Sequence, residues 1–219
     1  MGKCAVCKEE TTLKIAHAGV WFCKEHFLHY IKKKIKLGAR ELGIFDKKRN
    51  LGILMTGSSG SAVALAVMRE IAKERGTEII EINAKGKELN PNEIARIAKK
   101  NKVKIVVTGH SIEDFVLEML CLCSMKKPKK LLGLNPKDGI WGKVLGVSFP
   151  SPLFKVYQSE LEEYAKLCKL SYKPFKQKTN LALELSSFVE KMEEKHPGTK
   201  HKMLKSLLFF SGMESTAPG

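Results

Sequence analysis

The segment Leu51-Gly-Ile-Leu-Met-Thr-Gly-Ser-Ser-Gly-Ser61 reads as an apolar strand, a turn of small residues and the start of a helix. Such a unit directs backbone N–H groups and the positive end of the helix dipole toward one point, where a phosphate can bind. The turn Thr56-Gly57-Ser58-Ser59-Gly60-Ser61 has two glycines, which allow close backbone approach, and four hydroxyls. It contains no lysine and no carboxylate, so a polar turn with a serine N-cap and no bound anion is an equally good interpretation of this stretch.

The residues after this turn repeat the alternation of strand and helix. A helix ending at Gly76, a helix capped by Asn90-Pro91, and a strand leading into Thr108-Gly109-His110 are all predicted. This spacing is typical of an α/β fold with a doubly wound parallel sheet, in which ligands bind at the carboxyl ends of the strands. We therefore expect the turns at Thr56 and Thr108 to face one crevice. The predicted segments are helix 27–45, strand 51–55, helix 62–75, strand 77–83, helix 91–101, strand 103–107, helix 112–124, strand 143–149 and helices 159–170, 181–195 and 199–210.

Composition limits the partners of the chain. Of its 219 residues, 43% are hydrophobic, which is enough for a core that folds unaided. The 39 lysines and arginines exceed the 23 acidic residues, and the formal charge of +16 favours an anionic partner, nucleic acid before a membrane surface. No apolar run approaches the roughly 20 residues of a membrane span, and the N-terminus lacks a signal-peptide pattern. We expect a cytoplasmic protein without a membrane contact.

Four residues near the N-terminus are predicted to bind zinc. Cys4-x2-Cys7 and Cys23-x2-His26 are two ligand pairs separated by fifteen residues, a spacing that closes a tetrahedral site of three thiolates and one imidazole. Because the protein supplies all four ligands, the zinc is expected to be structural, and segment 16–22 is predicted to form a short hairpin. The other three cysteines are interpreted as core thiols, namely Cys121, Cys123 and Cys168.

Two lysine-rich stretches are candidate contacts for an RNA phosphate backbone. The first lies on the amphipathic helix predicted over residues 27–45 and consists of Lys32, Lys33, Lys34, Lys36 and Arg40. The second is a charge run on the loop after residue 124 and consists of Lys126, Lys127, Lys129 and Lys130. A solvated surface with no bound partner remains the alternative for both stretches.

Taken together, these motifs resemble the tRNA 2-thiolation (thiouridine synthetase) enzymes of the N-type ATP pyrophosphatase, or PP-loop, superfamily. The four metal ligands resemble that family's N-terminal zinc finger, and Thr108-Gly109-His110-x-x-Glu113-Asp114 resembles its T-G-H-N-x-D-D motif. Ser151-Pro152-Leu153 resembles R-P-L, and the segments 160–165 and 194–198 follow as in the family's C-terminal helical part. The resemblance implies a sheet of the adenine nucleotide α hydrolase type, preceded by a zinc knuckle and followed by helices.

The resemblance also implies an activity. Family members bind ATP on an S-G-G-x-D-S loop, adenylate the C2 oxygen of a uridine in tRNA and replace that oxygen with sulfur, and in many members cysteines hold an iron–sulfur cluster. It therefore implies tRNA as a partner and ATP with Mg²⁺ as a candidate ligand. The implied nucleotide contacts are Thr56, Gly57, Ser58, Ser59, Gly60, Ser61, Gly109, His110 and Asp114.

The chain departs from this family at the residues that carry the chemistry. Ser58 replaces a glycine, Ser59 replaces the lysine and Gly60 replaces the aspartate of the loop. Loss of the lysine removes a charge-assisted hydrogen bond worth roughly 1.5–3 kcal/mol. The family's C-x-x-C is absent from residues 83–102, and its third cysteine is replaced within residues 172–176. We therefore expect no iron–sulfur cluster and name no catalytic residue.

These observations predict four parts: a zinc knuckle (1–26), a basic linker helix and loop (27–50), a PP-loop-like α/β domain (51–150) and a C-terminal helical part (151–219). The favoured hypothesis is a divergent pseudoenzyme that binds tRNA, binds ATP weakly and acts as an accessory or catalytically altered protein, as a homodimer or with a catalytic partner subunit. The alternative is an active ATP-dependent tRNA uridine 2-sulfurtransferase that uses an external donor such as a sulfur-carrier protein. A nucleotide-sensing or DNA-binding module is a third hypothesis.

Overall fold

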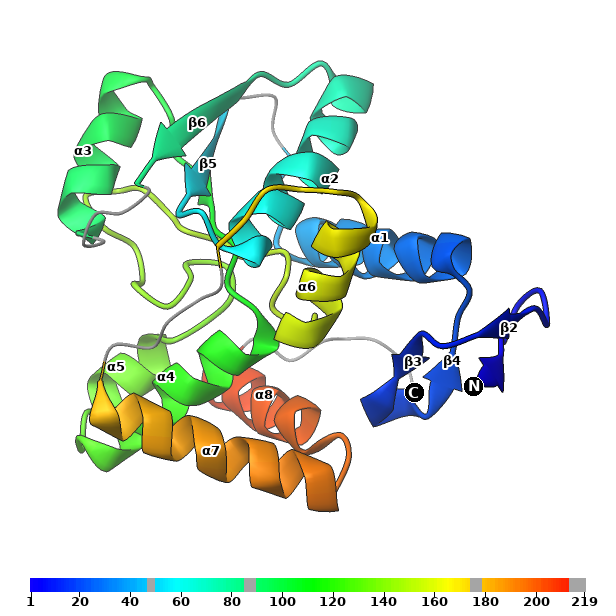
Figure 1. The fold of residues 1–219 in the computed structure, drawn as a ribbon. Coiled ribbons are helices and arrows are strands. Elements are labelled where there is room, and N and C mark those ends of the chain that lie inside the picture. Colours follow the sequence, from blue (N-terminus) through cyan, green and yellow to red (C-terminus); the bar gives the residue numbers. More distant parts are fainter. Residues whose placement is uncertain (47–49, 85–89, 174–178, 213–219) are drawn as a thin grey trace.

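The centre of the protein is a small parallel sheet (Figure 1). The computed structural model describes residues 1–46, 50–84, 90–173 and 179–212. In it the strands lie in the order β6 (Ile79–Asn83), β5 (Leu51–Met55) and β7 (Val106–Val107). All five residues of the central strand β5 are buried. Part of the segment 172–176, in which the family's third cysteine is replaced, lies outside the described residues.

Helices cover both faces of this sheet. Side chains alternate along β5, so Ile53 packs toward α1 (Lys24–Glu41) and α2 (Ser59–Arg75), whereas Leu54 packs toward α3 (Pro91–Lys100). The chain reaches α2 and α3 through the caps that the sequence signals: Gly76 has φ +59° at the end of α2, and the Asn90 side chain accepts from the backbone N–H of Asn92 and Glu93. The predicted doubly wound α/β architecture is confirmed.

The predicted strand over residues 143–149 is wrong. Val144 and Val147 hydrogen-bond each other across a tight turn in which Leu145 has φ +50° and Gly146 φ +80°. Only the residues after this turn run beside β7, where Val106 N–H donates to Ser148 O and Thr108 N–H to Pro150 O. β7 itself is shorter than the predicted 103–107, because regular pairing with β5 covers only Val106 and Val107.

The C-terminal helices pack on the helix that follows β7. α4 (Ile112–Ser124) contacts α7 (Asn180–Lys195) and α8 (Thr199–Phe210), and α6 (Gln158–Leu167) packs between α1 and α2. The charge run predicted to be a loop is partly helical, because Pro128 begins the short helix α5 (Pro128–Gly133). α1 begins at Lys24, earlier than the predicted residue 27. It ends at Glu41, earlier than the predicted residue 45, because Gly43, with φ +62°, terminates the helix. No helix in the described part of the chain is both long and apolar enough to cross a membrane.

The N-terminal segment forms two short antiparallel pairs beside α1. β1 (Gly2–Lys3) pairs with β2 (Glu10–Thr11), and β3 (Lys14–Ile15) pairs with β4 (Val20–Trp21). A single 3-10 turn, η1 (Ala16–Ala18), joins β3 to Gly19, which has φ +64°. A hairpin is therefore present, but it spans residues 14–21, so its first strand precedes the predicted segment 16–22 and η1 forms its tip. Cys23, two residues after β4, occupies the N-cap position of α1.

Candidate functional site

The hydroxyl groups of the turn between β5 and α2 form hydrogen bonds with other groups of the same turn. Ser58 is the N-cap of α2, and its Oγ accepts from Ser61 N–H at 3.2 Å and from Thr56 Oγ1 at 2.9 Å. Ser61 Oγ donates to the Ser58 carbonyl at 2.9 Å. α2 begins at Ser59, three residues earlier than predicted, because this capping network fixes the first helical turn. The serine N-cap is present, as the sequence indicates.

The two turns at the carboxyl end of the sheet lie in direct contact. A Cβ built on Gly60 would overlap the carbonyl oxygen of Gly109, and a Cβ built on Gly109 would overlap the Ser61 nitrogen. The turns at Thr56 and Thr108 therefore meet at one end of the sheet, but they leave no room for a side chain at either glycine. The close approach explains why small residues stand at both positions.

Two further predicted nucleotide contacts, Asp114 and His110, pack or hydrogen-bond within the protein. Asp114 accepts from Ser111 N–H at 2.7 Å and from Ser111 Oγ at 3.2 Å, so it caps α4. His110 lies against Phe115 and Trp141 with its ring edge-on to both. Its Nδ1 is buried and has no hydrogen-bond partner in the described part of the chain, and burial lowers its pKa. A neutral His110 is therefore expected at neutral pH.

A buried lysine joins this region to α8. Lys200 is 3% exposed, and its Nζ lies 2.9 Å from Glu113 Oε1 and 2.6 Å from Glu190 Oε1. Burial raises the pKa of Glu113 although Lys200 opposes that shift, while Glu113 and Glu190 raise the pKa of Lys200 against the effect of burial. Glu113 Oε2 also accepts from Gln158 N–H, and the Gln158 side chain donates to Ser59 Oγ at 3.0 Å. The acidic residue of the T-G-H motif thus connects the turn to three helices.

The four predicted metal ligands come together at the N-terminus. Their ligand atoms all lie within 4.8 Å of one another, with Cys7 Sγ 3.6 Å from Cys23 Sγ and Cys4 Sγ 3.6 Å from His26 Nδ1. A tetrahedral zinc ion with Zn–S bonds of about 2.3 Å and a Zn–N bond of about 2.0 Å would span such separations. Cys4, Cys7, Cys23 and His26 therefore fit a zinc ion that closes the knuckle.

A stack of rings that sequence reasoning missed joins the knuckle to the helices. His17 stacks on Tyr157 with ring centroids 4.1 Å apart, and Tyr157 Oη hydrogen-bonds His201 Nδ1 at 2.9 Å and Glu193 Oε1 at 3.0 Å. Burial, assisted by Lys34, lowers the pKa of each histidine to about 4. Burial, with Glu193, raises the pKa of Tyr157. The three rings come from η1, from the residue that precedes α6 and from α8, so no local motif reveals them.

The candidate RNA contacts on α1 differ in whether they form ion pairs within the protein. Lys34 is paired at 2.8 Å with Glu160, a carboxylate that is only 5% exposed. Lys32 and Lys36 pair with α2 through Glu70 and Glu74, and these pairs are exposed. The remaining two, Lys33 and Arg40, are exposed and make no ion pair within the described residues.

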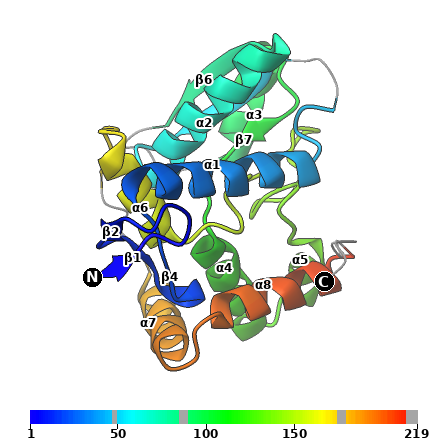
Figure 2. The ribbon, with the colours of Figure 1, turned by 90° about the vertical axis from the view of Figure 1, so that its right-hand side faces the viewer.

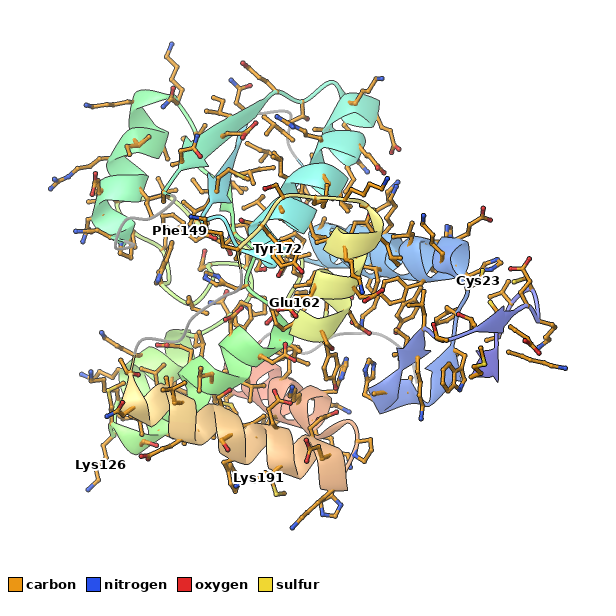
Figure 3. All side chains as sticks on the ribbon, in the orientation of Figure 1. Cys23, Lys126, Phe149, Glu162, Tyr172 and Lys191 are labelled. Atoms are coloured by element: carbon orange, nitrogen blue, oxygen red, sulfur yellow. The ribbon has the colours of Figure 1, made fainter. Side chains whose placement is uncertain are left out.

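The second lysine group lies at the far end of the molecule. Figure 3 places Lys126 where α4 and α5 meet, distant from Cys23 on the knuckle. All four lysines of this group are exposed: Lys126, Lys127, Lys129 and Lys130. The core-thiol prediction is wrong for Cys123, which is exposed, because it lies on the outward side of the last turn of α4. Cys121 and Cys168 are half-buried.

Comparison with known proteins agrees with the observed features. Residues 3–28 match the family model described as 2-thiouridine synthetase TtuA, N-terminal LIM domain. Over an alignment of 259 positions the chain is 20% identical to tRNA-5-methyluridine(54) 2-sulfurtransferase from Pyrococcus horikoshii, covering 94% of this chain and 82% of the relative. The solved structure of the U34-tRNA thiolase NcsA from Methanococcus maripaludis, with its [4Fe-4S] cluster, superposes with a TM-score of 0.73 at 19% identity and covers all of this chain and 90% of the other. The chain is thus similar to tRNA-thiolation proteins along its length, and it shares the fold of a tRNA thiolase.

Proposed function

We propose that this chain binds tRNA but has an altered nucleotide turn, so that it acts as an accessory or catalytically changed protein. The observation that carries the proposal is that the turn hydrogen-bonds its own hydroxyls and packs Gly60 against Gly109. A pyrophosphate group would have to displace these bonds without the lysine and the aspartate that the family loop supplies. The charge of +16 supports tRNA binding, and both relatives are named for tRNA.

Calorimetric titration of ATP into the protein, with and without tRNA, tests this proposal. We expect tRNA to bind with a steep dependence on salt, and ATP to bind only in the millimolar range whether or not tRNA is present. Micromolar ATP binding together with pyrophosphate release in the presence of tRNA would contradict the accessory role. Competition by a DNA of equal length as strong as that by tRNA would favour the DNA-binding alternative.

One contact favours the second candidate, an active tRNA uridine 2-sulfurtransferase that takes sulfur from an external donor. The backbone N–H of Lys173 donates to the Gly57 carbonyl at 2.8 Å, so an exposed lysine is anchored at the turn that lacks the family lysine. In this case Lys173→Ala should abolish pyrophosphate release that depends on tRNA and a sulfur donor. Lys166→Ala is the matched control, because Lys166 is 76% exposed on α6. Absence of release from the wild-type protein would reject this candidate.

Zinc without iron is the metal content that we propose. The four N-terminal ligands are the only group of three or more clustered metal-binding side chains within the described residues, and the other three cysteines do not join them. The solved neighbour is described with a [4Fe-4S] cluster, so metal analysis is decisive. About one zinc per chain and no iron is expected, and a brown protein that contains iron would overturn this part of the proposal. A homodimer, a catalytic partner subunit and a cytoplasmic location remain proposals.

A further inference from the structure

A cavity lies between the exposed side of α1 and the end of α2. Figure 2 shows α1 across the near face of the molecule, with α2 beside it. The cavity has a volume of about 420 Å³, which is within the range of small-ligand sites. Part of its lining is apolar and comes from α1, α2 and the segment that follows α1, namely Leu37, Phe45 and Ile71. The cavity is therefore neither a flat charged surface nor a wholly polar groove.

The rim of the cavity carries five cationic side chains, and three of them are free. Lys32 and Lys36 are held in ion pairs by α2, as described above. Within the described residues Lys33, Arg40 and Arg75 form no ion pair, and all three are exposed. The two acidic residues of the lining do not balance this charge.

Aromatic and cationic groups meet inside this cavity. The Arg75 guanidinium lies over the Phe45 ring at 5.8 Å. Proteins that bind unpaired RNA bases use aromatic rings and arginine planes as stacking surfaces, with lysine or arginine on the flanking phosphates. Stacking on Phe45 and Arg75 requires a planar apolar group, and neutralising Lys33 and Arg40 requires anions on either side of it. One nucleotide of a single strand meets both requirements, whereas a duplex keeps its bases stacked inside.

We propose that this cavity, the α1–α2 cavity, binds one unpaired nucleotide of RNA, with its base against Phe45 and its flanking phosphates on Lys33 and Arg40. The inference rests on the proposed tRNA binding and names the surface that performs it. It also separates the lysines of α1 into groups. Lys34 stabilises the fold through its ion pair with Glu160, and Lys32 and Lys36 line the cavity in ion pairs with α2. The unpaired Lys33 is left to contact the ligand.

Fluorescence anisotropy with two labelled probes tests the inference: an unmodified tRNA transcript and a blunt RNA duplex of equal charge. The double variant Lys33→Glu/Arg40→Glu should weaken tRNA binding at least tenfold and reduce the slope of log K against log salt by about 1.5, since each phosphate contact contributes roughly 0.7–0.9. The matched control is Lys99→Glu/Lys100→Glu on α3, which is exposed and lies on the opposite side of the sheet. It should change the affinity less than threefold.

A second variant tests whether an RNA base binds in the α1–α2 cavity. Leu37→Glu puts a carboxylate into the apolar lining at a position that is already 37% exposed, so the fold should be retained. It should reduce the preference for tRNA over the duplex about tenfold, because stacking of a base is worth about 1–3 kcal/mol. An unchanged preference would overturn the nucleotide assignment.

Three outcomes distinguish this inference from the proposed function. Equal losses in the α1 and α3 double variants would overturn the inference, because only overall charge would then matter. Loss of binding on reversing the charges at 126–130, with none on reversing Lys33 and Arg40, would also overturn it while tRNA binding by the protein stands. Absence of any tRNA binding by the wild-type protein would reject the proposed function itself.

Discussion

Replacing Gly60 with alanine tests whether the nucleotide turn is closed by backbone packing. The added Cβ would overlap the Gly109 carbonyl oxygen and lie 3.0 Å from its carbon, against an optimal carbon–carbon separation of about 3.5–4.0 Å. Gly109 cannot easily yield, because the neighbouring Thr108 N–H is fixed to Pro150 O at 2.8 Å. Overpacking of this kind costs about 1–3 kcal/mol, and the better helix propensity of alanine offsets up to about 1 kcal/mol of that. Because the overlap is with backbone atoms, the upper end of this cost, about 3 kcal/mol, applies and leaves a net destabilisation of about 2 kcal/mol.

Thermal and urea unfolding of Gly60→Ala measure this effect. For a chain of this size about 2 kcal/mol corresponds to a decrease in Tm of roughly 4–8 °C. Gly133→Ala is the matched control, because a Cβ there has nothing within 4 Å. It should leave the Tm unchanged or raise it slightly.

The substitution Gly60→Asp extends the test to function. It restores the carboxylate of the family loop, yet it meets the same obstacle as alanine and should both destabilise the protein and fail to tighten ATP binding. If Gly60→Ala were as stable as the wild-type protein, or if Gly60→Asp bound ATP more tightly, the closed turn would be the wrong explanation.

Three further predictions concern the parts around the turn. Chelation of the metal, or Cys23→Ser, should unfold the knuckle and lower the Tm while the sheet persists, as measured by metal release and circular dichroism. Burial lowers the pKa of His17 and His201 from 6.5 to about 4, so the unfolded chain binds more protons than the folded one in this window. The contribution of these two neutral histidines to the free energy of unfolding should therefore be fully present above about pH 6.5. It should be lost toward pH 4, with a slope of at most about 1.4 kcal/mol per pH unit for each histidine. Urea midpoints measured against pH should show a shallower slope in His17→Phe. Finally, Lys34→Ala leaves the Glu160 carboxylate buried without its cation and should destabilise the protein by about 3 kcal/mol in urea unfolding, whereas an unchanged midpoint would show the pair to be dispensable.

Elements with local signals were predictable from the sequence. The bounds of α4 and α8 agree with the prediction, and the ends of α2 and α3 follow from Gly76 and Asn90, because a cap is a contact between residues a few positions apart. The strand predicted at 143–149 failed although Gly146 was visible as a turn signal. The helix at Pro128 was likewise readable from a proline at its first position.

Contacts between distant residues could not be predicted. Lys200 and Glu113 are 87 positions apart, and Lys34 and Glu160 are 126 apart. A single sequence offers no signal that pairs such residues, and a lysine on an amphipathic helix reads as solvated until a partner is seen. For this reason the interpretation of α1 treated Lys34 as equal to Lys33, although only Lys33 is free to meet a ligand. The clustering of Cys4, Cys7, Cys23 and His26 was predictable because the spacing of such residues alone indicates a metal site.

The hydrogen bonds around the turn bear on whether nucleotide and RNA binding are coupled. Ser59 is tied to Gln158, Gln158 to Glu113, and Glu113 to Lys200, so a ligand that moved the turn would disturb a buried chain of polar contacts that reaches α8. Each such contact left unpaired costs about 1–3 kcal/mol. The α1–α2 cavity lies on another part of the surface and shares none of these bonds. Binding of RNA there should accordingly be independent of ATP, which equal tRNA affinities with and without the nucleotide would demonstrate.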